Sequence, residues 1–70
     1  MIEIVHCPLS AREIEIVRHL AQGQTAKDIA RKIGLTHFSI NERIKTMRRV
    51  VGANNTPHLT AMALRKGWIE

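Results

Sequence analysis

Hydrophobic residues recur at helical spacing in four segments that together cover most of the chain. The segments occupy residues 10–23, 25–34, 36–52 and 56–67, and each one ends at a glycine. Glycine commonly ends a helix because it adopts the left-handed backbone conformation without steric cost. The pattern therefore predicts an all-α fold of four helices. Only residues 2–5 alternate as a strand would, and they are equally compatible with an irregular lead-in.

A hydroxyl residue stands at the start of each predicted helix and can cap its free backbone N–H groups. Ser10 is followed three residues later by Glu13, which is the spacing of a capping box. Pro57 suits the first turn of the last helix, because its missing N–H costs no hydrogen bond there. The residues predicted to start the four helices are Ser10, Thr25, Thr36 and Thr56.

One face of each predicted helix is apolar, and the four faces together supply the predicted core. Trp68 follows the last glycine and is expected to fold back onto the last helix. Residues 9–70 are therefore predicted to form one domain, with residues 1–8 as a lead-in. The predicted core positions are Ile14, Val17, Leu20 and Ala21, then Ala26, Ile29, Ala30 and Ile33, then Ile40, Ile44, Met47 and Val51, and finally Leu59, Met62 and Ala63.

The composition fits a small domain without crosslinks. The chain has 70 residues and one cysteine, Cys7, so no disulfide can form within it and a structural zinc site is not indicated. No apolar run approaches the ~18 residues that a membrane span needs. These features predict a cytoplasmic protein that does not act in a membrane.

Positive charge is concentrated in the middle of the chain. The formal net charge is +5, from 11 basic and 6 acidic residues. Residues 24–53 carry seven of the basic and two of the acidic residues, whereas residues 1–23 are slightly acidic overall. A basic segment confined to one part of a small domain is typical of nucleic-acid binding.

The second and third predicted helices are joined by a very short turn of three residues, 34–36. A short helix, a tight turn that contains glycine and a longer helix are the signature of a helix-turn-helix motif. The third helix is then the predicted recognition helix, and the N-terminal half of such a helix contacts base edges.

The outward face of the third helix carries groups suited to reading DNA. At about 100° per residue, Phe38, Glu42, Lys45 and Arg49 lie opposite the apolar stripe, with Asn41 beside them. An ordinary solvent-exposed helix explains the charged residues, but it does not explain the only phenylalanine of the chain. Asparagine can bind adenine, lysine guanine, glutamate the cytosine amino group and phenylalanine a thymine methyl. Glu42 either accepts from a base or pairs with a basic residue of its own helix, and both readings stay open.

Residues 9–68 resemble a known family. The segments "LSAREIEIV", "LAQGQTAKDIARKIGLT" and "VGANNTPHLTAMA", together with Ser39–Ile40 and a basic residue at position 43, are similar to the LuxR-type DNA-binding domain, also called GerE-like or FixJ-like. The tail "PHLTAMALRKG" resembles quorum-sensing members most. The resemblance implies a four-helix domain whose third helix enters the major groove and whose fourth helix forms a dimer on a palindromic site.

The resemblance also implies roles for individual residues. Arg43 stands where the family often has histidine and is expected to strengthen a phosphate contact, whereas Val50 replaces a common lysine and is expected to lose one. The acid at position 42 means that the operator sequence does not follow from any relative. By position, the base-reading residues are Asn41, Glu42 and Lys45, to which the outward face adds Phe38, and the phosphate-contacting residues are Lys27, Thr36, Ser39, Arg43 and Arg49.

The fourth predicted helix carries an apolar pair outside its inward stripe. Leu64 lies about 140° around the helix from Leu59, with Ala61 near it. Because the resemblance implies dimerisation through this helix, Ala61 and Leu64 are predicted to form the dimer contact rather than to be scattered exposed residues. A domain of this size has little surface to spare, so the homodimer is expected to be weak without DNA.

No constellation of catalytic or metal-binding residues is evident. His6, His19, His37 and His58 are scattered without an i, i+4 pair, and no base is evident beside Cys7. We therefore expect no enzyme activity, no metal and no cofactor. The predicted function is a dimeric, sequence-specific transcriptional regulator that binds double-stranded DNA. The alternative is an interaction module that pairs with a full-length LuxR-type relative and antagonises it, and the chain is either a complete short regulator or a fragment of a longer one.

Overall fold

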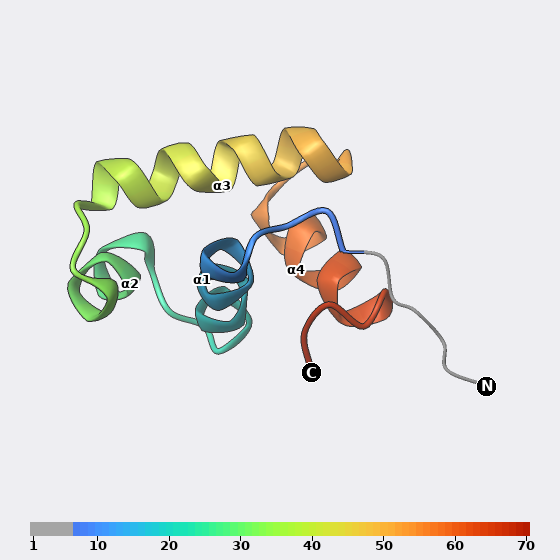
Figure 1. The fold of residues 1–70 in the computed structure, drawn as a ribbon, viewed down its shortest axis with the longest axis horizontal. Coiled ribbons are helices and arrows are strands. Elements are labelled where there is room, and N and C mark those ends of the chain that lie inside the picture. The colour runs from blue at the N-terminus through green and yellow to red at the C-terminus, as the bar shows by residue number, and fades with distance from the viewer. Residues whose placement is uncertain (1–6) are drawn as a thin grey trace.

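The computed structural model describes residues 7–70, and these residues form four helices. In Figure 1, the third helix lies lengthwise over the other three, with the second beneath its N-terminal end and the fourth beneath its C-terminal end. The prediction of an all-α fold is confirmed. The alternating residues 2–5 and most of the predicted lead-in lie outside the described residues. The helices are α1 (Ala11–Ala21), α2 (Ala26–Ile33), α3 (His37–Val51) and α4 (Thr56–Arg65).

Side-chain caps start the first three helices as the sequence predicts. The Ser10 hydroxyl accepts from the backbone N–H of Glu13 at 3.2 Å, and the Glu13 carboxylate accepts from the backbone N–H of Ser10 at 2.9 Å. Thr25 and Asp28 form the same reciprocal pair at the start of α2. The Thr36 hydroxyl accepts from a backbone N–H in the first turn of α3 at 3.1 Å. Each cap satisfies N–H groups that the helix itself leaves free.

The start of α4 differs by one residue from the prediction. Asn55, not Thr56, is the capping residue, because its side-chain oxygen accepts from the backbone N–H of His58 at 2.8 Å. Thr56 is the first residue of the helix, and its carbonyl oxygen accepts from the hydroxyl of Thr60 at 3.2 Å. Pro57 still lies in the first turn, where its lack of an N–H costs nothing.

The buried face of α1 is wider than its predicted stripe. Ile16 is fully buried although the stripe did not include it, and Ala21, which was predicted to be core, is exposed. The reason is that α1 packs against all three other helices, so more than one side of it is covered. Ala21 is the last residue of the helix and lies beyond this cover. The predicted inward positions of α2 and α3 are all buried or half-buried.

The C-terminal residues close one side of the core. Gly67 adopts a positive φ of 76°, and the backbone N–H of Trp68 then donates to the Ala63 carbonyl at 2.8 Å. Trp68 packs against the core cluster, as predicted. Ile69 is also buried, with 3% of its surface exposed, and the sequence pattern did not identify it because it lies outside any helix.

A short corner fixes α4 relative to α3. Gly52 ends α3 in the left-handed conformation, and the guanidinium of Arg48 donates to the Asn54 carbonyl at 2.8 Å. The backbone N–H of Asn54 in turn donates to Nδ1 of His58 at 3.0 Å. Arg48 therefore holds the corner between the two helices.

The capping box of α2 also sets the ionisation of Asp28. The backbone N–H of Thr25 donates to the Asp28 carboxylate at 3.1 Å, and this hydrogen bond lowers the pKa of Asp28 below its ordinary value of 3.8. The cationic side chains of Arg31 and Lys32 act in the same direction. The folded state therefore favours the ionised carboxylate.

This shift predicts a specific pH dependence for Asp28→Asn. The ionised carboxylate stabilises the folded state above its ordinary pKa of 3.8, and this stabilisation is lost as the pH falls through the lower, folded pKa. The variant is expected to have a smaller free energy of unfolding than the wild type at neutral pH, and the difference should shrink in acid. Urea unfolding over a pH series measures both, with the exposed Glu15→Gln as a control. A difference that stays constant with pH contradicts this role.

Candidate nucleic-acid interface

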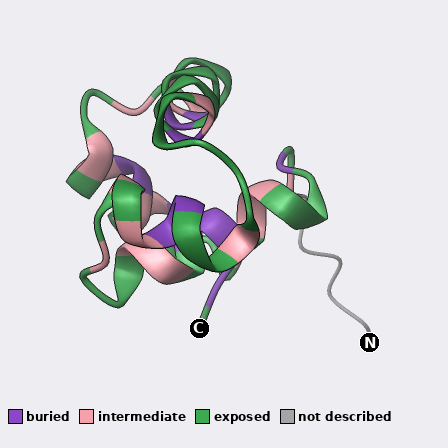
Figure 2. Ribbon diagram, turned by 90° about the vertical axis from the view of Figure 1, so that its left-hand side faces the viewer, coloured by how far each residue is buried: buried purple, intermediate pink, exposed green. Residues whose placement is uncertain are grey.

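The outer face of α3 is exposed along its whole length, and its side chains are polar or charged except for Phe38. Figure 2 looks along this helix and shows buried residues only on the side that faces the other helices. Phe38 projects from the outer face with 69% of its surface exposed, although phenylalanine is normally buried. The neighbouring exposed residues on this face are Asn41, Glu42, Lys45 and Arg49. The prediction that this face points away from the core is confirmed.

The turn between α2 and α3 sets the direction of this face. Gly34 adopts φ 85° and ψ 30°, a left-handed conformation that side chains with a Cβ rarely adopt. Its backbone N–H and that of Leu35 both donate to the Ala30 carbonyl, at 2.8 and 3.0 Å. Thr36 then caps α3 directly after the turn. Since Ile29 and Ile40 are both fully buried, the core fixes the two helices on either side of this turn.

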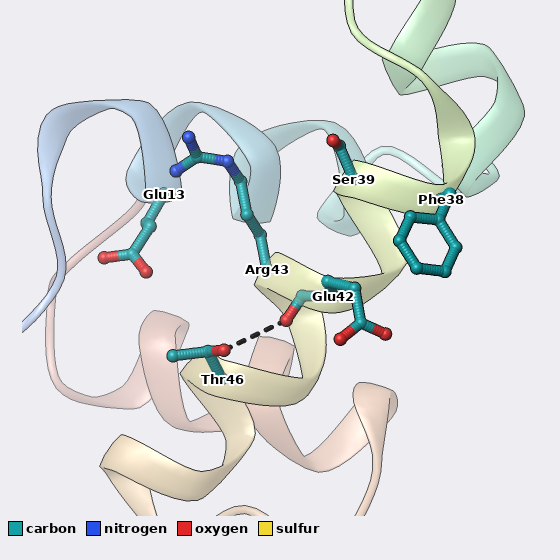
Figure 3. A pocket seen from close by; sticks show the side chains of 6 residues that line it. All are labelled: Glu13, Phe38, Ser39, Glu42, Arg43 and Thr46. Carbon is teal, nitrogen blue, oxygen red and sulfur yellow. Dashed lines mark hydrogen bonds between the residues drawn. The ribbon is translucent and has the colours of Figure 1, made fainter.

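An open groove of about 340 Å³ is lined by Phe38, Ser39, Glu42 and Arg43 of α3 (Figure 3). Arg43 points toward Glu13 of α1, and Phe38 and Glu42 point away from it. The groove is also lined by Glu13 of α1 and by Thr46, whose hydroxyl donates to the Glu42 carbonyl at 3.0 Å. The sequence gives no sign that Glu13 lies near Arg43, because the two residues are 30 positions apart.

Some charged side chains of α2 and α3 form ion pairs and others do not. Nζ of Lys45 lies 3.4 Å from Oε2 of Glu42, and both side chains are more than half exposed. The other ion pairs among residues 7–70 are Arg12–Glu15 and Arg31–Asp28. Within the same residues, Lys27, Arg43 and Arg49 form no ion pair. These three cations are therefore available to an external anion.

The predicted phosphate-contacting residues come from α2, from the cap of α3 and from α3 itself. Lys27 is exposed near the start of α2, Thr36 is exposed at the start of α3, and Ser39 is half-buried one turn later. Arg43 and Arg49 continue along α3. Arg48 does not belong to this set, because its guanidinium is held by the corner before α4.

The predicted dimer residues line a second, mainly apolar groove. Leu64 is 49% exposed and Ala61 is exposed, so both lie off the inward face of α4, as predicted. The groove measures about 620 Å³ and runs between α4 and the C-terminal end of α1. Its lining residues are Leu20, Ala21, Gly23, Gln24, Thr56, Pro57, Thr60, Ala61 and Leu64.

The remaining candidate groups show no arrangement for metal binding within the described residues. His19, His37 and His58 belong to no cluster of metal-binding side chains within the described part of the chain, and His6 lies outside it. Cys7 is half-buried, and its thiol donates to the Leu9 carbonyl at 3.7 Å.

From residue 7 onward, no helix combines the length and the apolar character needed to cross a membrane.

Comparison with known families identifies the domain. The family described as "Bacterial regulatory proteins, luxR family" (GerE) matches residues 7–63, which contain all of the helix-turn-helix motif and most of α4. The chain belongs to this family. The four helices are thus those of a LuxR-type helix-turn-helix domain, and α3 is its recognition helix. The LuxR-type domain is the DNA-binding part of transcriptional regulators and is not an enzyme.

Two curated relatives support this assignment. The chain is 36% identical over 62 residues to the uncharacterized transcriptional regulatory protein YvfU of Bacillus subtilis, covering 89% of this chain and 31% of that protein. It is 33% identical over 57 residues to the transcriptional activator protein BjaR1 of Bradyrhizobium diazoefficiens, covering 81% of this chain and 24% of that protein. The LuxR-type chain therefore spans less than a third of the length of either relative. No solved structure matches it significantly.

Proposed function

We propose that this LuxR-type domain binds a palindromic operator in the cytoplasm as a dimer, with α3 of each subunit in the major groove. The observation that carries the proposal is the outer face of α3, where an exposed phenylalanine stands among hydrogen-bonding and charged side chains. A partner that covered the exposed Phe38 ring would gain the free energy of removing its apolar surface from water. The major groove offers such cover at thymine methyl groups, and it admits one α-helix.

Base reading falls to the N-terminal half of α3. Phe38 contacts a thymine methyl, and Asn41 makes a bidentate contact to adenine. Glu42 accepts a hydrogen bond from a base, and Lys45 donates one to a base. All four side chains are exposed on the same face, which a recognition helix requires.

Phosphate contacts come from residues of α2 and α3 outside the reading set. Lys27, Arg43 and Arg49 supply cations that form no ion pair with a carboxylate among residues 7–70. The hydroxyls of Thr36 and Ser39 lie near the N-terminus of α3, where backbone N–H groups and the helix dipole also favour an anion. These contacts orient the domain on the duplex and carry no sequence information.

Selection of bound sites from a pool of random duplexes tests the proposal directly. A palindromic motif with two half-sites about one helical turn apart is the expected result. The affinity for the selected site should fall steeply between about 50 and 200 mM salt, because counterions are released from the neutralised phosphates. Binding that barely responds to salt contradicts the proposal.

Arg43→Ala is expected to weaken binding to the operator and to random DNA alike. A hydrogen bond to a charged group is worth about 1.5–3 kcal/mol. Each lost phosphate contact also makes the negative slope of log K against log salt less steep by about one. Fluorescence anisotropy titrations over a salt series measure both quantities. The control is Arg18→Ala, which removes the same charge from an exposed position outside the proposed contacts. A change in base preference with Arg43→Ala contradicts a phosphate role.

The apolar groove beside α4 favours a second candidate function. A chain with this docking surface could pair with a longer LuxR-family protein and keep it from its operator. Such an antagonist has no use for unpaired cations at positions 27, 43 and 49, so the face of α3 favours DNA binding. A gel shift on duplex DNA with and without a longer relative separates the two functions: the antagonist removes the relative's shifted band and forms none of its own.

A further inference from the structure

The Glu42–Lys45 ion pair lies in the middle of the face that is proposed to read bases. Nζ of Lys45 and Oε2 of Glu42 are 3.4 Å apart, with side chains 65% and 52% exposed. A carboxylate on a surface that approaches phosphates weakens DNA binding unless it has a function there. An ion pair this exposed contributes little to folding, so stability does not explain it.

We infer that Glu42 and Lys45 act as one unit that reads a single C·G base pair. This inference rests on the proposed function, because it requires α3 to enter the major groove. The pair presents an acceptor oxygen beside a donor nitrogen. The major-groove edge of a C·G pair presents the complement, a cytosine N4 donor beside a guanine O6 acceptor. Those two base atoms share a Watson–Crick hydrogen bond and are therefore about 2.9 Å apart, close to the spacing of the ion pair.

An A·T pair matches the ion pair less well. It also presents a donor, adenine N6, beside an acceptor, thymine O4, but the thymine methyl group lies next to that oxygen. In a C·G pair, guanine N7 lies next to O6 as a second acceptor. The Lys45 ammonium has three donors and can use both acceptors of guanine. The pattern of donors and acceptors therefore selects C·G over A·T.

The pairing of the two side chains in the free protein supports this specificity. Glu42 lies 3.4 Å from the Lys45 ammonium in the free protein, so the pairing restricts the Lys45 side chain and less of its freedom is lost on binding. Against a wrong base pair, the carboxylate or the ammonium loses water without gaining a partner, which disfavours that complex. Glu42 therefore acts both by contacting cytosine and by positioning Lys45.

The test compares the operators selected by the wild type, Glu42→Gln and Lys45→Met from one random duplex pool. Both variants should lose a preference of about tenfold or more for C·G at the same position of each half-site and keep the other positions. Both side chains are exposed, so thermal unfolding should be unchanged. Glu15→Gln is the matched control, because it removes a carboxylate from another exposed i, i+3 pair, Arg12–Glu15. This control should select the wild-type motif.

Two results overturn the inference alone. Loss of preference at different positions means that the two residues read separate base pairs, and an unchanged motif in either variant means that this residue reads none. A wild-type protein that selects no motif overturns the proposed function and the inference together. The two failures are therefore distinguishable in one experiment.

Discussion

Replacing Leu64 by aspartate is expected to lower the affinity for a full palindromic operator by about 100-fold or more, which is the gain that joining two binding events gives. In the proposed dimer, Leu64 of α4 is buried between subunits. An aspartate there would lose its water without a partner, which costs several kcal/mol. Affinity for a single half-site should barely change, because α3 is untouched.

The same substitution should leave the monomer folded. Leu64 is 49% exposed and lies outside the core cluster, so the monomer does not depend on it. Titrations with full and half operators give the two affinities, and thermal unfolding checks the fold. Loss of folding would mean that Leu64 belongs to the core. Cooperative binding of the folded variant to the full site would mean that the dimer contact lies outside α4.

Ile16→Ala should cost about 2–5 kcal/mol of the free energy of unfolding, the usual range for removing most of a buried aliphatic side chain. Ile16 is fully buried where α1 meets the other three helices. A domain of 70 residues has about 3.5–10 kcal/mol of stability in total, so this variant should be close to unfolding or unfolded.

Urea unfolding monitored by circular dichroism measures this loss. Val50→Ala is the control, because Val50 is 57% exposed and a surface substitution usually changes stability by less than about 0.5 kcal/mol. A loss at Ile16 no larger than that at Val50 would contradict the burial of Ile16.

Features that depend on residues three or four positions apart were predictable from the sequence. The capping boxes at Ser10 and Thr25 involve only i, i+3 contacts, and so does the pairing of Glu42 with Lys45, which was one of two open readings. The cap of α4 was misplaced because Asn55 and Thr56 are adjacent and both suit that position.

Features that depend on tertiary contacts were less accessible. Ile16 was missed because a single apolar stripe describes a helix covered on one side, whereas α1 is covered on several. The approach of Glu13 to the groove beside Arg43 joins two distant segments, and no local pattern encodes it. The base-reading, phosphate and dimer residues stay predictions, because they concern partners of this chain.

The corner held by Arg48 has a consequence for the evolution of operators. Its hydrogen bonds to Asn54 and from Asn54 to His58 fix the angle between α3 and α4. In the proposed dimer, this angle sets the distance between the two recognition helices. Binding therefore depends on the spacing between the two half-sites as well as on their sequence. The bases between the half-sites are then free to mutate, while an insertion or deletion among them turns one half-site about the duplex axis by roughly 35° per base pair. Operators of the proposed dimer should therefore drift in the composition of their spacers and keep the spacer length constant.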